Sequence, residues 1–152
     1  MSTPEDRIQA LGLTLPDVVP PVAAYVPAVR SGQHVFTAGQ LPMREGALLH
    51  PGKVGAAVTE AQAVEAAQQC GLNALAAVKS VVGELSAVKR VVKVVVFVAS
   101  DPGFTGQPKV ANGVSEMIGE VFGDAGRHAR SAVGVAVLPL DAPVEVELLV
   151  EV

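Results

Sequence analysis

Hydrophobic residues recur along this chain with two different periods, which predict helices and strands in a definite order. Over 59–83, apolar residues return every three or four positions, the period of a helix that buries one face. Thr59 and Gln62 have the spacing of a capping box at the start of this helix, and Gly83 is a typical helix end. The same period predicts a second helix over 108–122.

A small-residue face marks the first of these helices. Gly71 falls on its apolar stripe between Ala67 and Ala74. A glycine inside a helix costs about 1 kcal/mol relative to alanine. We expect this small face to let the helix approach the sheet closely, which would offset that cost.

Strands are predicted where β-branched residues form a continuous apolar segment or alternate with polar residues. The nearly continuous apolar run 88–99 predicts a central strand covered on both faces, and Val or Leu alternating with Glu predicts a last strand over 144–152 with one acidic face. A hairpin is predicted around the turn at 30–33. The other predicted strands are 22–29, 34–37, a short one at 47–49 in the loop 42–55, and 131–138, which leads into a turn at 139–143.

The order of elements is β-β-α-β-α-β-β. It predicts an α+β fold in which two helices pack on one face of a mixed sheet. We expect residues 1–17 to form an N-terminal arm with a short amphipathic helix at 8–15, and residues 18–152 to form one domain. A chain of 152 residues is long enough to bury a core without disulfides.

Composition narrows the class of protein. The net charge of −4 is spread without a block of either sign, which disfavours a general polyanion binder. Four Phe, one Tyr and no Trp argue against a stacking platform for nucleic acid. The most apolar run, 91–99, contains Lys93 and is too short to span a membrane. Only 17% of residues are charged, below the roughly 25% of an average domain, which favours a homo-oligomer that hides apolar surface.

The number of cysteines bears on the cellular compartment in which the protein is expected to work. Cys70 is the only cysteine and is expected to be a buried structural thiol. Residues 1–15 carry no signal-peptide pattern, so we expect a cytoplasmic protein in a reducing environment.

The sequence carries no strong local catalytic motif. The three histidines (His34, His50 and His128) lie far apart and are expected to be exposed turn residues, with no metal site. Arg130 lies at the start of a predicted strand. There its guanidinium could bind a carboxylate through two hydrogen bonds, or it could pair with the acidic face of the last strand. Glu145 could hold such an arginine, orient a water or belong to a solvated face. Tyr25 could be an ordinary half-buried ring.

Several segments, in order along nearly the whole chain, resemble one protein family. They are Tyr-Val-Pro-Ala at 25–28, Val-Phe-Thr-Ala-Gly-Gln-Leu-Pro at 35–42, the strand at 92–98, Asn112, Arg-Ser-Ala-Val-Gly-Val-Ala-Val-Leu-Pro at 130–139 and Val-Glu-Val-Glu at 144–147. They are similar to the YjgF/YER057c/UK114 family, also called RidA or reactive-intermediate deaminases. The resemblance implies a chorismate mutase-like fold and a homotrimer with clefts between its subunits.

The resemblance also implies a reaction. Well-known members hydrolyse 2-imino acids, formed from enamines such as 2-aminoacrylate, to 2-keto acids and ammonia without a metal or organic cofactor. Carried over by motif, Arg130 would bind the substrate carboxylate and Glu145 would position or activate the attacking water. Tyr25 would line the cleft from an adjacent chain, and Gly39 and Asn112 would line it too.

Two substitutions and the chain length depart from the family pattern. Ala132 stands where many members have cysteine, and Ala38 where many have serine, so only backbone groups could serve at these positions. The extra length indicates a longer branch of the family. A trimer that binds 2-keto acids without turnover, or has a regulatory role, is therefore the alternative. An endoribonuclease or translation inhibitor is the third hypothesis, because the acidic, aromatic-poor composition disfavours binding of nucleic acid.

Overall fold

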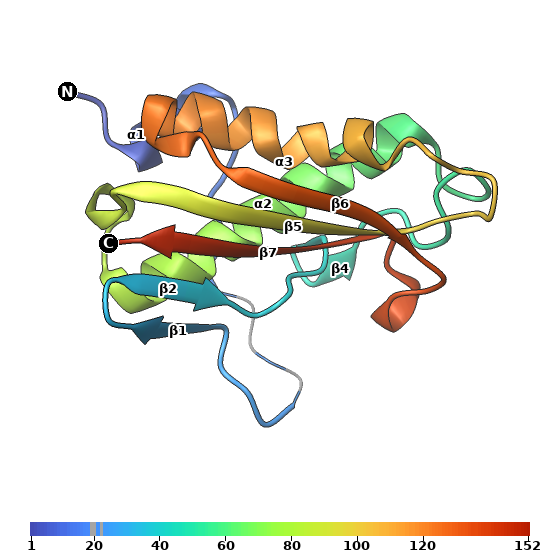
Figure 1. Cartoon of the computed structure of the whole chain (residues 1–152), viewed down its shortest axis with the longest axis horizontal. Coiled ribbons are helices and arrows are strands. Elements are labelled where there is room, and N and C mark those ends of the chain that lie inside the picture. Colours follow the sequence, from blue (N-terminus) through green and yellow to red (C-terminus); the bar gives the residue numbers. More distant parts are fainter. Residues whose placement is uncertain (19–20, 22) are drawn as a thin grey trace.

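A five-stranded mixed sheet forms the centre of the computed structural model, which describes residues 1–18, 21 and 23–152 (Figure 1). In spatial order its strands are β1 (Ala28–Ser31), β2 (His34–Thr37), β7 (Val144–Glu151), β5 (Arg90–Ala99) and β6 (Ala129–Val135). β5 and β6 are parallel, and all other neighbours are antiparallel. β3 (Met43–Arg44) and β4 (Ala47–Leu48) form a separate hairpin. The predicted mixed sheet is confirmed, although β7 and not β5 is its middle strand.

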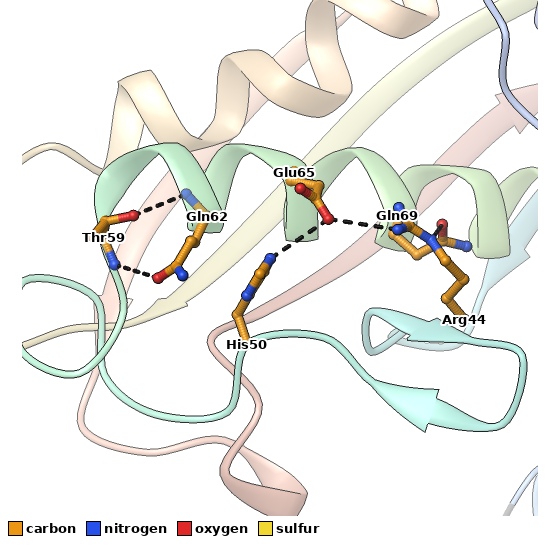
Figure 2. A network of polar contacts seen from close by, with 6 residues as sticks. All are labelled: Arg44, His50, Thr59, Gln62, Glu65 and Gln69. Atoms are coloured by element: carbon orange, nitrogen blue, oxygen red, sulfur yellow. Dashed lines mark hydrogen bonds and ion pairs between the residues drawn. The ribbon is translucent and has the colours of Figure 1, made fainter.

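The two predicted helices are α2 (Glu60–Val82) and α3 (Gln107–Phe122). α2 begins with the predicted capping box: the Gln62 N–H donates to Thr59 Oγ1 (3.1 Å), and the Thr59 N–H donates to Gln62 Oε1 (3.0 Å) (Figure 2). It ends at Gly83, whose φ of 88° is a conformation that glycine adopts without strain. Among the described residues, no helix has both the length and the apolar character that a membrane span requires.

The N-terminal helix α1 spans Pro4–Ala10, so the prediction of a helix over 8–15 was wrong. A second capping box, between Thr3 and Asp6, starts it four residues earlier than the amphipathic pattern indicated. Ile8 is buried in the core, and α1 packs against α3. The first residues of the chain therefore extend the helical layer.

Side chains alternate across the pleat of the sheet, and α2 and α3 cover only one of its two faces. On β5, Val94, Val96 and Val98 are fully buried, whereas Val95 and Phe97 are only half-buried. The prediction that this strand is covered on both faces was therefore wrong within one chain. We call the side without helices the open face; its side chains include Val29, Phe36, Lys93, Val95, Phe97, Val133, Glu145, Glu147 and Leu149.

Strand ends differ from prediction near prolines. The predicted strand 22–29 starts at a position outside the described residues, and β1 itself begins only at Ala28, directly after Pro27. β6 ends at Val135, three residues before the predicted end, and the turn that follows contains a 3₁₀ segment over Pro139–Asp141. Proline has no backbone N–H to give to a ladder, which limits the start of β1. β6 ends at Val135 because this residue pairs with Ala99, the last residue of its partner β5.

Gly71 faces α3 and not the sheet, which corrects the predicted role of the small-residue face. A Cβ at Gly71 would lie 2.6 Å from Val114 Cγ2 and 2.9 Å from Met117 Cε, both on α3. Val114 and Met117 are buried. The glycine therefore sets how closely the two helices approach each other.

We expect Gly71→Ala to lower the free energy of unfolding by about 1–3 kcal/mol, because the added methyl group overpacks the contact between α2 and α3. Gly119→Ala is the matched control, since a Cβ there meets nothing within 4 Å. That substitution should raise stability by about 0.5–1 kcal/mol through helix propensity. Denaturant unfolding of both variants measures the difference, and stabilisation by both would contradict the close approach.

Candidate active site

A pocket of about 310 Å³ lies beside Glu145 and brings together three of the predicted site residues, Tyr25, Gly39 and Glu145. Its walls are mostly apolar. The lining residues are Pro21, Tyr25, Pro27, Gly39, Gln40, Leu41, Met43, Pro139, Leu140 and Glu145. The pocket thus joins the segment before β1, the loop after β2, the start of β3, the turn before β7 and β7 itself.

Gly39 is required by the position of the Glu145 carboxyl group. A Cβ at Gly39 would overlap Glu145 Oε1 and lie 2.9 Å from Glu145 Cδ. The next residue, Gln40, is bound to β7 by two backbone hydrogen bonds with Val146 (2.8 and 3.0 Å). Because the backbone is fixed there, a side chain at position 39 would push the carboxyl group out of its place.

Glu145 is half-buried, and this environment suits a proton acceptor. Burial raises the pKa of the Glu145 carboxyl above its ordinary value, and the charge of Glu147 on the same face raises it further. A carboxylate with a raised pKa takes a proton from water more readily. Glu145 therefore differs from the solvated glutamate that alternation alone suggested.

The turn before β7, which contributes to the pocket wall, contains a strained backbone. Leu140 and Asp141 have φ values of 59° and 60°, a left-handed conformation that costs a residue with a side chain about 1–2 kcal/mol. The Gly52 N–H donates to the Asp141 carbonyl (2.8 Å), which helps to hold the turn. Leu140 lines the pocket although 69% of it is exposed. Sequence reasoning missed Leu140, since no sequence pattern signals a positive φ at leucine.

Asn73 on α2 fixes another part of the pocket wall. Its buried Nδ2 group donates to the carbonyls of Leu41 and Met43, both at 2.9 Å, and its Oδ1 accepts from Gln69 Nε2 at 3.1 Å. Leu41 and Met43 both line the pocket. α2 thus anchors the loop that carries them.

A polar network continues along α2 and holds the hairpin β3–β4 (Figure 2). Arg44 Nε donates to Gln69 Oε1 (3.0 Å), and Arg44 Nη1 lies 3.5 Å from Glu65 Oε1. His50 Nε2 lies 3.5 Å from the same Glu65 oxygen. The loop after β2 is therefore attached to the helix at several points.

Arg130 lies on the other side of the sheet. In β6 it pairs with Val94, whose side chain is buried under the helices. Its Nη1 donates to Asn112 Oδ1 (2.8 Å) and Ser115 Oγ (3.2 Å), both on α3. The structure thus joins Arg130 to the predicted Asn112, whereas Ser115 was not predicted. Ala132, on the same face, is half-buried against the core.

Strand register separates Arg130 from Glu145. Phe97 pairs with both Glu145 and Val133, so these three side chains share the open face. Arg130 stands three residues from Val133 along β6 and so points to the opposite face. The hypothesis that Arg130 pairs with the acidic face of the last strand was therefore wrong, and one chain does not bring Arg130 and Glu145 into one pocket.

The three histidines were predicted to be exposed turn residues, and this prediction is only partly right. His34 is exposed but belongs to β2. His50 and His128 are half-buried. His128 makes hydrogen bonds with Ser115 and the Gly126 carbonyl, whereas His50 Nε2 lies 3.5 Å from Glu65 Oε1 and has no hydrogen-bond partner among the described residues. Within the described residues, no group of three or more His, Cys, Asp or Glu side chains could hold a metal ion.

Cys70 is fully buried, as predicted. Burial raises the pKa of its thiol well above the ordinary value, and Sγ lies 3.5 Å from the Val144 carbonyl. A neutral thiol under the sheet has a packing role.

We expect Glu145→Gln to raise the free energy of unfolding at pH 7. The folded protein holds the Glu145 proton more tightly than the unfolded chain, so ionisation above the ordinary pKa of glutamate costs stability. The gain should shrink below about pH 4, where the carboxyl group is protonated in both states. Denaturant unfolding at both pH values tests this, with the exposed Glu120→Gln as control. A less stable variant at pH 7 would contradict the burial cost.

Comparison with known proteins identifies relatives of the whole chain. Protein TCP17 of Trypanosoma cruzi is 46% identical over 146 residues, which cover 95% of this chain and 91% of TCP17. The crystal structure of Atu1372, a protein of unknown function from Agrobacterium tumefaciens, is 46% identical and superposes with a TM-score of 0.93, covering 99% of this chain and 93% of that one. A structure from Shewanella oneidensis MR-1, described as "a putative endoribonuclease", is 35% identical with a TM-score of 0.96 and covers 99% of this chain and 100% of its own.

A family model described as "YjgF/chorismate mutase-like, putative endoribonuclease" matches residues 5–152. The predicted α+β fold, with its mixed sheet and helical layer, is confirmed. The match includes every strand, both long helices and most of α1. This chain belongs to the YjgF/chorismate mutase-like family.

Proposed function

We propose that the protein is an imine and enamine deaminase that hydrolyses 2-imino acids to 2-keto acids and ammonia. The observation that carries the proposal is the half-buried Glu145, with its raised pKa, in a largely apolar pocket next to a glycine where any side chain would displace the carboxyl group. Arg130 supplies a carboxylate-binding group that no acidic side chain among the described residues neutralises. A pocket for the substrate side chain, a base and a cation are the groups that this reaction requires.

The proposed reaction uses one water molecule. Arg130 binds the substrate carboxylate through two parallel hydrogen bonds and so orients the imine carbon. Glu145 accepts a proton from the water as the water oxygen bonds to the carbon of the protonated imine, which gives a carbinolamine. Glu145 then returns this proton to the amine nitrogen. The C–N bond breaks, ammonia leaves, and the hydroxyl group loses its proton to solvent as the keto group forms. The 2-imino acid and water thus yield the 2-keto acid and ammonia.

We also propose that the site lies between copies of the chain in a homotrimer. Because Arg130 and Glu145 are on opposite faces of one sheet, a cleft that contains both needs Arg130 from one chain and Glu145 from another. The open face supports this, since Val29, Phe36 and Val133 each leave about half of their surface exposed (51%, 48% and 45%). In this arrangement Tyr25 accompanies the Glu145 of its own chain.

Turnover tests the activity directly. A serine or threonine dehydratase generates 2-aminoacrylate, and release of the keto acid is measured with and without the protein. We expect clear acceleration by the wild type and a loss of about 100-fold or more in Arg130→Ala and Glu145→Gln, since each removes a group that the reaction needs. No acceleration, or equal acceleration by Arg130→Ala, would refute the deaminase.

Gly39→Ala adds a more selective variant to this assay. The overlapping atoms belong to the end of the flexible Glu145 side chain, so the fold should tolerate the methyl group while the carboxyl group moves. We expect lost turnover with little change in melting temperature. Gly46→Ala is not a suitable control because its φ of 80° is strained for alanine, whereas Gly119→Ala is suitable.

Mixed trimers test the shared site. Arg130→Ala and Glu145→Gln are each expected to be inactive alone, but a trimer that contains both regains a complete cleft wherever an intact Arg130 meets an intact Glu145. Random mixing in equal amounts should restore about a quarter of wild-type activity, since each cleft needs the right variant on both sides. Co-expression with two affinity tags isolates the mixed species, in which one cleft of the three is complete, so the purified mixed trimers should show about a third of wild-type activity. Activity that does not recover, in a mixture shown to be trimeric, would place the site within one chain.

The alternative function is a binder of 2-keto acids without turnover. Ala132 and Ala38, which depart from the family pattern, favour it. Calorimetry with pyruvate and 2-oxobutyrate separates the two functions, because a binder shows affinity that depends on Arg130 but accelerates no hydrolysis.

A ribonuclease is the third candidate, favoured by the description of the Shewanella oneidensis relative. For this chain, RNA cleavage would have to persist through every purification step and be lost in a site variant. The net charge of −4 and the scarcity of aromatic residues argue against it.

A further inference from the structure

We propose that Ser115 and His128 are positioning residues that orient the guanidinium of Arg130 for a substrate carboxylate. This inference rests on the proposed function, in which Arg130 binds that carboxylate. A chain of hydrogen bonds runs from the Gly126 carbonyl through His128 and Ser115 to Arg130. Neither Ser115 nor His128 belongs to the residues that the family resemblance assigned to the site.

The chain of contacts fixes the tautomer of His128. Its Nδ1 lies 2.6 Å from the Gly126 carbonyl oxygen, which only accepts, so Nδ1 carries the hydrogen. In the neutral ring Nε2 is then an acceptor, and it lies 2.9 Å from Ser115 Oγ. The Ser115 hydroxyl therefore donates to His128. Its oxygen lone pairs are thereby directed toward Arg130 Nη1 at 3.2 Å.

The contacts at Arg130 involve only one end of the guanidinium. Nη1 carries two hydrogens, and both have acceptors: Asn112 Oδ1 at 2.8 Å and Ser115 Oγ at 3.2 Å. Among the described residues, the Nε and Nη2 atoms of Arg130 have no side-chain acceptor. The edge between Nε and Nη2 presents two parallel N–H groups, the geometry that binds a carboxylate in bidentate fashion.

None of the groups that hold Arg130 is a carboxylate. An amide and a hydroxyl contact the guanidinium, and an imidazole holds the hydroxyl, so the side chain is restricted without loss of its charge. A protein carboxylate in the same place would compete with the substrate. Arginine otherwise loses considerable rotamer freedom when it is fixed by a ligand. Fixing it beforehand lowers that cost on binding. The structure therefore assigns Ser115 and His128 a role in substrate affinity.

Calorimetry with 2-oxobutyrate as the probe, together with steady-state turnover of 2-aminoacrylate, tests the role on the full chain. We expect Ser115→Ala and His128→Leu to weaken binding and raise KM about 5–10-fold, with a smaller change in kcat, because a uniform loss of carboxylate binding acts on KM. Ser115→Thr keeps the hydroxyl and His128→Gln keeps an acceptor, so each should recover most of the affinity. The exposed Ser86→Ala is the matched control and should bind as the wild type does.

The outcomes separate this inference from the proposed function. If Arg130→Ala abolishes 2-oxobutyrate binding while Ser115→Ala and His128→Leu bind as tightly as the wild type, the positioning role is wrong and the proposed function stands. If Arg130→Ala binds as tightly as the wild type, the proposed function itself fails. A loss of affinity that Ser115→Thr and His128→Gln do not recover, with an equal drop in melting temperature, would indicate a purely structural contact and overturn the inference.

Discussion

The structure depends on a sheet that has helices on one face only. Because side chains alternate across the pleat of β5 and β7, each strand contributes one row to the buried core and one row to the open face. That alternation places Arg130 and Glu145 on opposite sides of the molecule.

The helical layer is close-packed because its contact residues are small. Gly71 lets α2 meet Val114 and Met117 of α3, and this contact holds the long helix in the position from which Asn73 reaches the loop beside the pocket. Core packing and pocket shape are therefore coupled through α2. A change in the distance between the helices would be transmitted to Leu41 and Met43.

Two local features of the pocket cost stability and are retained. Glu145 is kept half-buried next to Glu147, and Leu140 and Asp141 adopt left-handed backbone conformations. Strain of this kind persists where the surrounding structure imposes it, and it concentrates at functional sites. On the other face, Arg130 is held by Asn112 and Ser115, and no carboxylate among the described residues pairs with it.

Hydrophobic periodicity determined the order of the elements, both long helices and the mixed sheet, because each of these follows from local spacing. Several motifs in order along the chain, above all those around Arg130 and Glu145, also indicated the family. Tertiary structure decided that Gly71 faces a helix, that Leu140 lines the pocket and that Ser115 contacts both His128 and Arg130, since these contacts join different elements of the fold. It also decided that the two charged site residues lie on opposite faces, because strand register, which sets the direction of each side chain, depends on which strands become neighbours.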